Sequence, residues 1–337
     1  MARFILRRVL LALPALLGLV LLTFVLTRVI PADPAAMLAG DAATPAQVAE
    51  IRTRYGLDQP MWRQAVTHVR QVLTGDLGSS IFTGRPVAEE IGFRLPATLE
   101  LTFVALFLSV VLGVPLGLVA ALDHNGPVDQ IVRLLSVGGL AIAGFWLAIM
   151  LQLLFCMEWE LLPLRGRIDV ALGVPPGFSG LYLLDSLLAG RLDLFVDALR
   201  HLVLPAVTLC LPGLASIARF TRSGVLETLQ KDFVLYARAA GYSPFRLATI
   251  YVLRNAVTVT VTQVGLLFGA LISGAVAVEA IFDWPGLGTY AVQAILAADY
   301  KALLAVTLVV GVVYAVVNVL VDVAQALVDP RVAEQMK

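Results

Sequence analysis

Long apolar stretches alternate with polar segments along the chain. Each stretch is close to the length of about 20 residues that a helix needs to cross the hydrocarbon core of a bilayer. The pattern therefore predicts an all-α polytopic membrane protein with six transmembrane helices. The expected spans are residues 9–29, 97–122, 133–157, 200–218, 255–280 and 302–326. A further apolar run, 170–184, is interrupted by Pro175-Pro176-Gly177 and by Gly180, and is predicted to be a loop or an interfacial segment.

Composition supports a membrane protein and excludes several functional classes. The 337 residues are 59% hydrophobic and 14% charged, whereas soluble domains are about 45–50% apolar and about 25% charged. The 24 basic residues balance the 24 acidic ones, which argues against nucleic acid as a partner. Cys156 and Cys210 lie in apolar runs and are predicted to be core residues.

Basic residues near the span ends predict the orientation. With the N-terminus in the cytoplasm, the cytoplasmic segments hold about half of the 24 Lys and Arg. These segments are together only about half as long as the outer ones, so basic residues are denser on the cytoplasmic side. Both termini are therefore expected in the cytoplasm. Residues 30–96 form a folded outer loop and residues 219–254 a cytoplasmic loop. The first apolar run is too long for the 7–15-residue core of a signal peptide and is expected to be retained.

The outer loop 30–96 carries signals for two short helices. Thr44 and Gln47 have the spacing of a capping box, Pro45 suits the first helical position, and Gly56 suits the end. A second helix is expected over 60–73, with Trp62, Val66, Val69 and Leu73 on one face. These helices either cap the bundle or form a docking surface for an outside partner.

Glycines and polar residues mark several spans. Gly113 and Gly117, like Gly265 and Gly269, are four residues apart, a spacing that allows close helix packing. The second pair lies on a stripe with hydroxyl residues and near Gln263, so a face that lines a wet path is the alternative.

Three carboxylates, Glu100, Glu279 and Asp322, lie in spans or at their edges. An ionisable group at membrane depth is costly, so each is either a structural anchor or a group that handles substrate or protons.

No catalytic motif is recognisable. The chain lacks the G-x-S-x-G and H-E-x-x-H patterns, a cysteine-rich metal site and the G-x-x-x-x-G-K-[ST] phosphate loop. The chain is therefore expected not to be an enzyme and to hold no cofactor or metal of its own.

The cytoplasmic loop 219–254 is too long for a simple turn and carries six basic residues. Asp232 is predicted to be the N-cap of a helix over 233–240, with Gly241 as its left-handed stop. Ser243-Pro244 then begins a second helix. A short, alanine-rich helix with a sharp turn is better suited to a groove on a protein than to a membrane surface.

The residues of this loop resemble the coupling loop of bacterial ABC-importer permeases. Residues 232–241, DFVLYARAAG, and 253–256, LRNA, are similar to the dipeptide/oligopeptide/nickel permease family. The similarity continues through FILRR at 4–8, GDLG at 75–78, LPATLEL at 95–101 and EAIFDWPGLG at 279–288, with DPR at 329–331. The size and the long 158–200 loop are most similar to the first subunit of dipeptide permeases.

This resemblance implies a type I ABC-importer permease fold in a bacterial inner membrane and an import function for dipeptides or short peptides. It also implies three kinds of partner, namely a second homologous permease chain, two ATP-binding subunits that hold ATP and Mg, and an extracytoplasmic peptide-binding protein. The residues expected to couple to the ATPase are Asp232, Tyr236, Ala237, Arg238, Ala240 and Gly241. Those expected at the translocation path or its gate are Glu100, Gln263, Glu279, Pro285 and Gly286.

Some alternatives stay open at this point. Leu235 and Ala240 depart from the Arg and Lys that are common in the peptide branch. The same family also includes importers of oligopeptides, nickel or metal chelates, and haem. An alternative from another class is an ion-coupled secondary transporter that uses the carboxylates in its spans.

Overall fold

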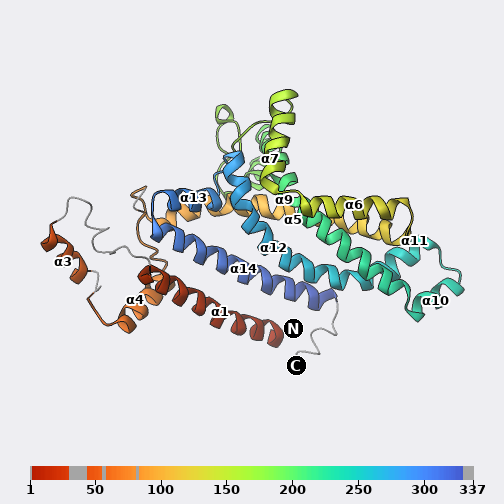
Figure 1. Cartoon of the computed structure of the whole chain (residues 1–337), viewed down its shortest axis with the longest axis horizontal. Coiled ribbons are helices and arrows are strands. Elements are labelled where there is room, and N and C mark those ends of the chain that lie inside the picture. The colour runs from red at the N-terminus through yellow and green to blue at the C-terminus, as the bar shows by residue number, and fades with distance from the viewer. Residues whose placement is uncertain (1, 30–43, 55–57, 81–82, 329–337) are drawn as a thin grey trace. The chain divides into compact units, whose positions relative to one another are not determined.

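The described residues of the computed structural model, 2–29, 44–54, 58–80 and 83–328, are helices joined by turns and loops (Figure 1), with one isolated antiparallel bridge between Ser79 and Pro86. The α-helices are α1 (Ala2–Val29), α3 (Pro45–Arg54), α4 (Met61–Leu73), α5 (Val87–Leu122), α6 (Pro127–Ala141), α7 (Gly144–Gln152), α8 (Tyr182–Leu188), α9 (Leu192–Leu229), α10 (Asp232–Ala239), α11 (Pro244–Arg246), α12 (Arg254–Phe282), α13 (Leu287–Leu296) and α14 (Tyr300–Val328). Two π-helical segments, η1 (Leu153–Glu158) and η3 (Leu247–Leu253), and a 3-10 turn, η2 (Val170–Leu172), complete the helical structure of these residues.

Among the described residues, five helices are long and apolar enough to cross a membrane, namely α1, α5, α9, α12 and α14. The third expected span, 133–157, is not one straight helix. Its residues divide between α6 and the α7–η1 segment, which meet at an angle of 98°. Ile142 and Ala143 are extended rather than helical, which breaks the hydrogen-bond ladder between the two helices. The expectation of six spans is met only if this bent pair counts as one.

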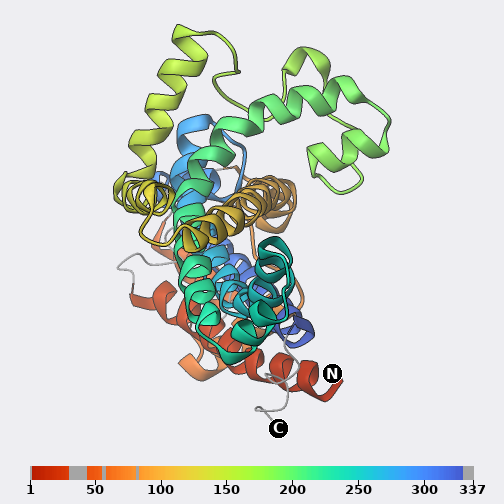
Figure 2. The same ribbon diagram turned by 90° about the vertical axis from the view of Figure 1, so that its right-hand side faces the viewer.

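The chain forms two compact units, a larger one of residues 1–6, 91–293 and 316–337 and a smaller one of residues 7–90 and 294–315. Within the larger unit α9 is the central helix, since it contacts α6, α7, α8, α12 and η3. The most apolar stretch of α9 is 67% buried, whereas the corresponding stretches of α5 and α12 are 28% and 39% buried. Figure 2 shows α8 next to the first turns of α9.

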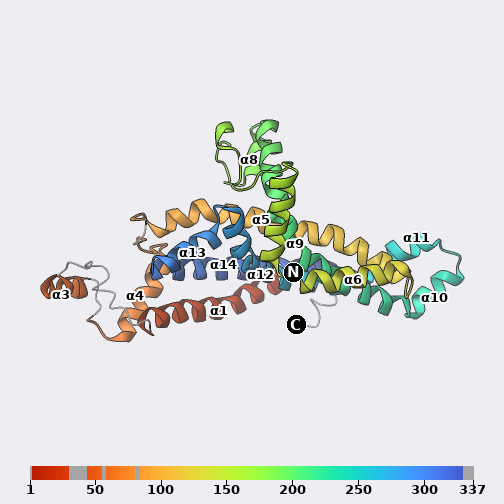
Figure 3. The ribbon, with the colours of Figure 1, turned by 45° about the horizontal axis from the view of Figure 1, so that its top comes forward.

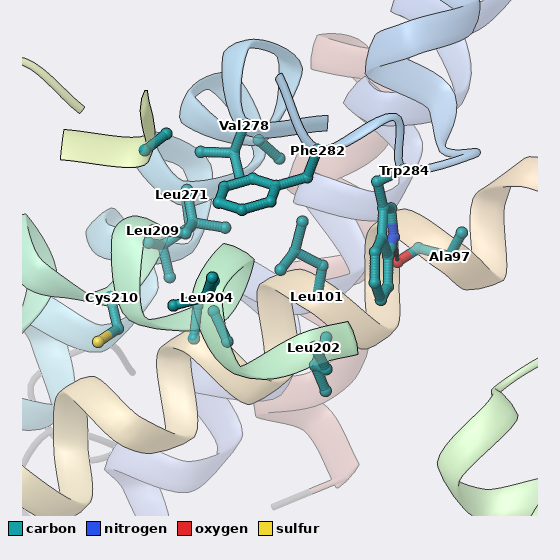
Figure 4. Packing of buried hydrophobic residues seen from close by; sticks show 14 residues of the cluster. Ala97, Leu101, Leu202, Leu204, Leu209, Cys210, Leu271, Val278, Phe282 and Trp284 are labelled. Carbon is teal, nitrogen blue, oxygen red and sulfur yellow. Dashed lines mark hydrogen bonds between the residues drawn. The ribbon is translucent and has the colours of Figure 1, made fainter. Parts of the chain in front are cut away.

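The main hydrophobic core joins α5, α9 and α12. Leu101 of α5, Leu202 of α9 and Phe282 of α12 are each at most 2% exposed (Figure 4). Trp284, just beyond the end of α12, is 1% exposed in the same cluster. Because these residues come from three separate segments, their burial holds α5 and the end of α12 against α9.

The small residues of α5 serve close helix packing, as one of the two interpretations expects. A side chain on Gly113 would meet Cβ of Ile217 at 2.9 Å, and one on Gly117 would meet the backbone oxygen of Ala218 at 2.5 Å. Both neighbours lie on α9. In α12, a side chain on Gly265 would meet Val321 of α14 at 3.0 Å.

The first loop contains the two short helices expected from the sequence. The Thr44 amide donates to Oε1 of Gln47 at 2.8 Å, and the Gln47 amide donates to Oγ1 of Thr44 at 3.4 Å. This reciprocal pair is the capping box that the spacing predicts. Gly56, the expected end of that helix, lies outside the described residues, and the second expected helix is α4.

Candidate functional site

The helix α10 is the part of the cytoplasmic loop that sequence patterns define best. Gly241 adopts φ +77°, its amide donates to the Arg238 carbonyl at 3.0 Å, and the Tyr242 amide donates to the Ala237 carbonyl at 3.2 Å. These two bonds form a Schellman motif, whose left-handed position favours glycine. The helix therefore ends where the sequence predicts.

The beginning of α10 differs from the expectation. Asp232 is the first helical residue and not the N-cap, which is Lys231, and no side chain caps the helix there. In the first turn, the Asp232 carboxylate still lies where the helix dipole favours a negative charge.

A small buried cluster fixes α10 to the helices around it. Val234 and Ala237 are 0% and 6% exposed, and they pack with Val225 of α9 and with Leu247 and Val252 of η3. Ala237, one of the residues expected to couple to the ATPase, therefore has its side chain in the protein's own core and not on an exposed face. Burial of Val234 selects this face, since residues 234 and 237 lie on the same side of a helix.

The opposite face of α10 is open. Tyr236 is 77% exposed and Leu235 is 55% exposed, and Arg238 and Ala240 are also exposed. This face is partly apolar, carries a cation and has no covering element among the described residues. It has the composition of a surface that another protein covers.

The second helix of the loop also begins as expected. The Ser243 side chain accepts a hydrogen bond from the Arg246 amide at 3.4 Å, and its carbonyl accepts one from the Leu247 amide at 2.9 Å. The chain then continues through η3 into α12. Tyr242 and Tyr251 have ring centroids 5.4 Å apart, which joins the glycine turn to η3.

At the other end of α12, Glu279 is fully buried. Thr98 of α5 donates a hydrogen bond to Glu279 Oε1 at 2.6 Å, and the Thr289 amide donates to Oε2 at 3.1 Å. Thr289 lies in the first turn of α13, so the Glu279 carboxylate caps this helix from the last turn of α12. The Thr98 hydroxyl also accepts from the Leu287 amide at 2.8 Å.

Two glycines let the backbone approach Glu279. A side chain on Gly286 would overlap the Glu279 carboxyl group. A side chain on Gly288 would lie 2.5 Å from Cα of Val276 and 2.9 Å from Oε2 of Glu279. The P-G-L-G segment at 285–288 is therefore shaped around this carboxylate, and Pro285 between Trp284 and Gly286 is exposed.

Glu100, close to Thr98 in α5, is held by the 158–200 loop. The Arg167 guanidinium forms an ion pair with Glu100 Oε2, and the Leu183 amide donates to Oε1 at 2.8 Å. Both side chains of the pair are at most 5% exposed. Arg167 also donates to the Gly180 carbonyl at 3.1 Å and lies 3.7 Å from the Tyr182 ring centroid.

These contacts meet at one place, which we call the α5 anchor. It consists of Thr98, Glu100, Arg167, Glu279 and Trp284, whose indole nitrogen donates to the Ala97 carbonyl at 2.9 Å. The anchor joins α5, the end of α12, the start of α13 and the 158–200 loop. Glu100 and Glu279 are thus engaged by donors on several sides, a geometry that favours structural anchoring over exchange of substrate or protons.

Asp185 orders the part of the loop next to the anchor. It accepts hydrogen bonds from the Ser179 hydroxyl at 2.8 Å and from the Gly180 amide at 2.9 Å. Burial would raise the pKa of the Asp185 carboxyl, but these hydrogen bonds outweigh it and hold the pKa below its ordinary value. The stabilisation is therefore present at neutral pH and is lost only as the pH falls through the lowered pKa.

Sequence reasoning missed two residues that the structure places at the centre of contacts. The first is Arg167. Glu100 lies in a predicted span, and a carboxylate at that depth needs a cationic partner, so a search for such a partner could have identified Arg167. The second is Asp129, which is fully buried. Its carboxylate accepts from Arg222 at 2.5 and 2.8 Å and from Arg133 at 2.7 Å. This cluster joins the start of α6 to α9 within the larger unit.

Neither Gln263, expected at the path, nor Asp322, the third carboxylate of the spans, joins the α5 anchor. Gln263 is half-buried in α12, about four turns from Glu279, and Asp322 is half-buried in α14. Gln325 of α14 donates to the Thr262 hydroxyl at 2.7 Å. The polar stripe of α12 thus has at least one contact with α14.

The chain is similar to known transport proteins over nearly its full length. Residues 113–334 match a family described as the binding-protein-dependent transport system inner membrane component, and residues 1–102 match the N-terminal part of such membrane components. The chain is 42% identical to the probable D,D-dipeptide transport system permease protein DdpB of Escherichia coli, over 94% of this chain and 93% of that protein. It is 38% identical to the dipeptide transport system permease protein DppB of the same organism, over 98% and 99%. It is 39% identical to the di/tripeptide transport system permease protein DppB of Pseudomonas aeruginosa, over 99% and 100%. The chain belongs to the family of inner-membrane components of binding-protein-dependent transport systems.

Proposed function

We propose that this permease imports dipeptides or short peptides that an extracytoplasmic binding protein delivers. The chain is a multi-pass inner-membrane subunit of an ABC transport system and not an enzyme. The choice of substrate rests on the relatives, which are permeases of D,D-dipeptide, dipeptide and di/tripeptide transport systems. Oligopeptides, metal chelates and haem are the competing substrates.

The observation that carries the mechanism is the two-sided helix α10. Its inner side, Val234 and Ala237, is buried against α9 and η3, and its outer side exposes Tyr236 and Leu235. We propose that the exposed side lies in a groove on an ATP-binding subunit. A force on α10 then reaches α9 and α12 directly, because close-packed side chains transmit displacement rather than absorb it.

The complex that this mechanism needs has four further subunits or partners. We propose a second homologous permease chain, two ATP-binding subunits that hold ATP and Mg, and the extracytoplasmic binding protein. In this arrangement α10 and both termini are cytoplasmic, and the 158–200 loop is outside. Exposed apolar side chains of that loop, such as Val170 and Phe178 at 92% and 75%, suit contact with the binding protein.

The α5 anchor has a defined part in this cycle. We propose that it keeps the ends of α5 and α12 together with the 158–200 loop, so that this end of the path opens and closes as one body. Gln263, close to the hydroxyl stripe of α12, lies nearer the middle of that helix and is the candidate for contact with the passing peptide.

The first test is purification of a tagged chain in mild detergent, with mass spectrometry of the proteins that accompany it. We expect stoichiometric recovery of P-loop ATPase subunits and of a second permease chain. Reconstituted vesicles with the binding protein should then take up a labelled dipeptide in an ATP-dependent way, and unlabelled dipeptide should compete better than a longer peptide. A chain that is recovered alone and moves solute down an ion gradient would refute the proposal and support the secondary transporter.

Replacing Gly241 by valine is expected to uncouple ATP hydrolysis from uptake. Gly241 has φ +77°, and a Cβ added to it would meet no other atoms within 4 Å, so the effect comes from backbone strain and not from a clash. A left-handed conformation costs other residues about 1–2 kcal/mol, which is about 5–30-fold in the population of the correct turn. ATPase activity and peptide uptake measured on the same vesicles should show a lower ratio of uptake to hydrolysis.

Gly241→Asn is the matched control, because asparagine tolerates the left-handed conformation better than other non-glycine residues. We expect it to keep a ratio close to that of the unmodified chain. An equal and normal ratio in both variants would contradict the role of this turn in coupling.

A further inference from the structure

The helix α4 has an apolar stripe that the rest of the described chain leaves uncovered. Trp62, Val66 and Leu73 are 63%, 63% and 81% exposed, and their spacing of four and seven residues places them on one side of the helix. Val69 lies between them and is half-buried. A helix that kept this stripe in water would lose the benefit of burying a tryptophan and two aliphatic side chains.

The other side of α4 contacts the last turns of the apolar segment of α1, as Figure 3 also shows. Thr23 Oγ1 lies 3.5 Å from Nε2 of His68, and the rings of Phe24 and His68 have centroids 5.8 Å apart. The apolar segment of α1 that is long enough to cross a membrane is Ile5–Leu26. Residues 23 and 24 therefore lie near one end of the apolar segment of α1, and α4 contacts α1 at that end.

The side chains of α1 beside this contact include exposed apolar residues. Leu21, Leu22 and Val25, next to the residues that contact His68, are 41%, 54% and 48% exposed. The apolar length of α1 requires lipid or another membrane helix around it. The helix α4 thus contacts one end of a helix whose exposed apolar side chains need a membrane around them.

The charges of α4 indicate which membrane groups it meets. Its thirteen residues include Arg63 and Arg70 and no Asp or Glu. Both arginines are exposed, and on the helix they flank Val66 at the edge of the apolar stripe. Arg63 lies 5.1 Å from the Trp62 ring centroid. Tryptophan at the edge of the hydrocarbon and cations beside it are typical of helices that lie in the interface.

We propose that α4 lies in the headgroup region of the bilayer at this end of α1, with its apolar stripe among the acyl chains and Arg63 and Arg70 on the phosphates of anionic phospholipids. The partner is the lipid surface and not a protein segment, because α4 contacts one end of a membrane-spanning helix and carries arginines and no carboxylate beside its apolar stripe. The inference goes beyond the transport function and does not depend on its substrate or direction.

The first experiment measures the depth of single spin labels on α4. Labels are placed on Val66→Cys, in the stripe, and on Thr67→Cys, one residue further and on the polar side, in a chain with Cys156 and Cys210 replaced by alanine. The full chain, with the subunits that accompany it, is reconstituted into vesicles of phosphatidylcholine and phosphatidylglycerol. We expect the label at 66 to collide with oxygen and to be protected from a water-soluble nickel chelate, and the label at 67 to show the reverse.

The two positions form a matched pair, since both are exposed and neither substitution removes a buried contact. The inference is overturned if the nickel chelate reaches both labels equally. It is also overturned if the label at 66 becomes protected only when an extracytoplasmic binding protein is added, because the stripe would then be a protein-docking face. Neither result depends on whether the complex imports peptides.

The second experiment identifies the lipid. Fluorescence from Trp62 is obtained as the difference between the unmodified chain and Trp62→Phe, in vesicles that carry bromine on either phosphatidylglycerol or phosphatidylcholine. We expect stronger quenching by the brominated anionic lipid, and equal quenching by both lipids after Arg63→Gln and Arg70→Gln. Equal quenching in the unmodified chain would overturn the assignment of the arginines to anionic phosphates.

Discussion

Replacing Arg167 by methionine is expected to abolish most uptake and to lower the stability of the larger unit. The change keeps an apolar stem but leaves the Glu100 carboxylate buried without the guanidinium that pairs with it. Removal of one partner from a buried ion pair costs about 3–5 kcal/mol, because the remaining charge is desolvated and uncompensated. Uptake by vesicles and the apparent unfolding temperature of the purified complex measure the two effects.

Two variants separate the lost ion pair from other effects of the substitution. Arg165→Met is the matched control, since Arg165 lies two residues away and is exposed. We expect it to behave like the unmodified chain. The double variant Glu100→Gln with Arg167→Met removes the buried charge as well and should recover part of the stability. If Arg165→Met and Arg167→Met have the same effect, the ion pair is not what holds this loop.

Replacing Gly288 by valine is expected to disrupt the turn between α12 and α13. A side chain at this position would lie 2.5 Å from Cα of Val276, and backbone cannot move aside as a flexible side chain can. Overpacking typically costs about 1–3 kcal/mol. The valine would also displace the Glu279 carboxylate. A Thr98 hydroxyl or Thr289 amide left without this acceptor would lower the stability by about a further 1–3 kcal/mol.

The predicted consequence of Gly288→Val is a complex that assembles in reduced amount and that takes up peptide several-fold more slowly. Gly177→Val is the control in the 158–200 loop, because Gly177 is exposed and a Cβ added to it would meet no other atoms within 4 Å. Recovery from the membrane and the initial rate of uptake are measured for both. Equal rates would show that the close approach of this backbone to α12 is not required.

The coupling loop illustrates how far local patterns reach. The end of α10 could be predicted, because a Schellman motif depends on a few neighbouring residues and on the preference of glycine for positive φ. The exposed face of α10 could not, because an eight-residue helix has apolar residues on both sides. Ala237 is buried only because Val225 and Leu247 pack against that side.

The third span shows the same limit. Its residues are apolar over the length of a membrane helix, so composition predicts one span. The bend of 98° comes from two extended residues, Ile142 and Ala143, which the sequence does not distinguish from helical ones. Gly144 at the start of α7 is compatible with either conformation.

The residues alone were enough to predict a helical membrane protein, the positions of its apolar segments and the end of the helix α10, whereas the permease function came from the resemblance of its motifs to a known family. The structural features follow from hydrophobicity and turn preference, which act over a few residues to about twenty. Only the folded chain shows that Glu100 pairs with Arg167, 67 residues away, and that Thr98 donates to Glu279, 181 residues away. Such pairings depend on which helix ends meet in the folded chain, and a buried carboxylate accepts a donor from any segment that reaches it.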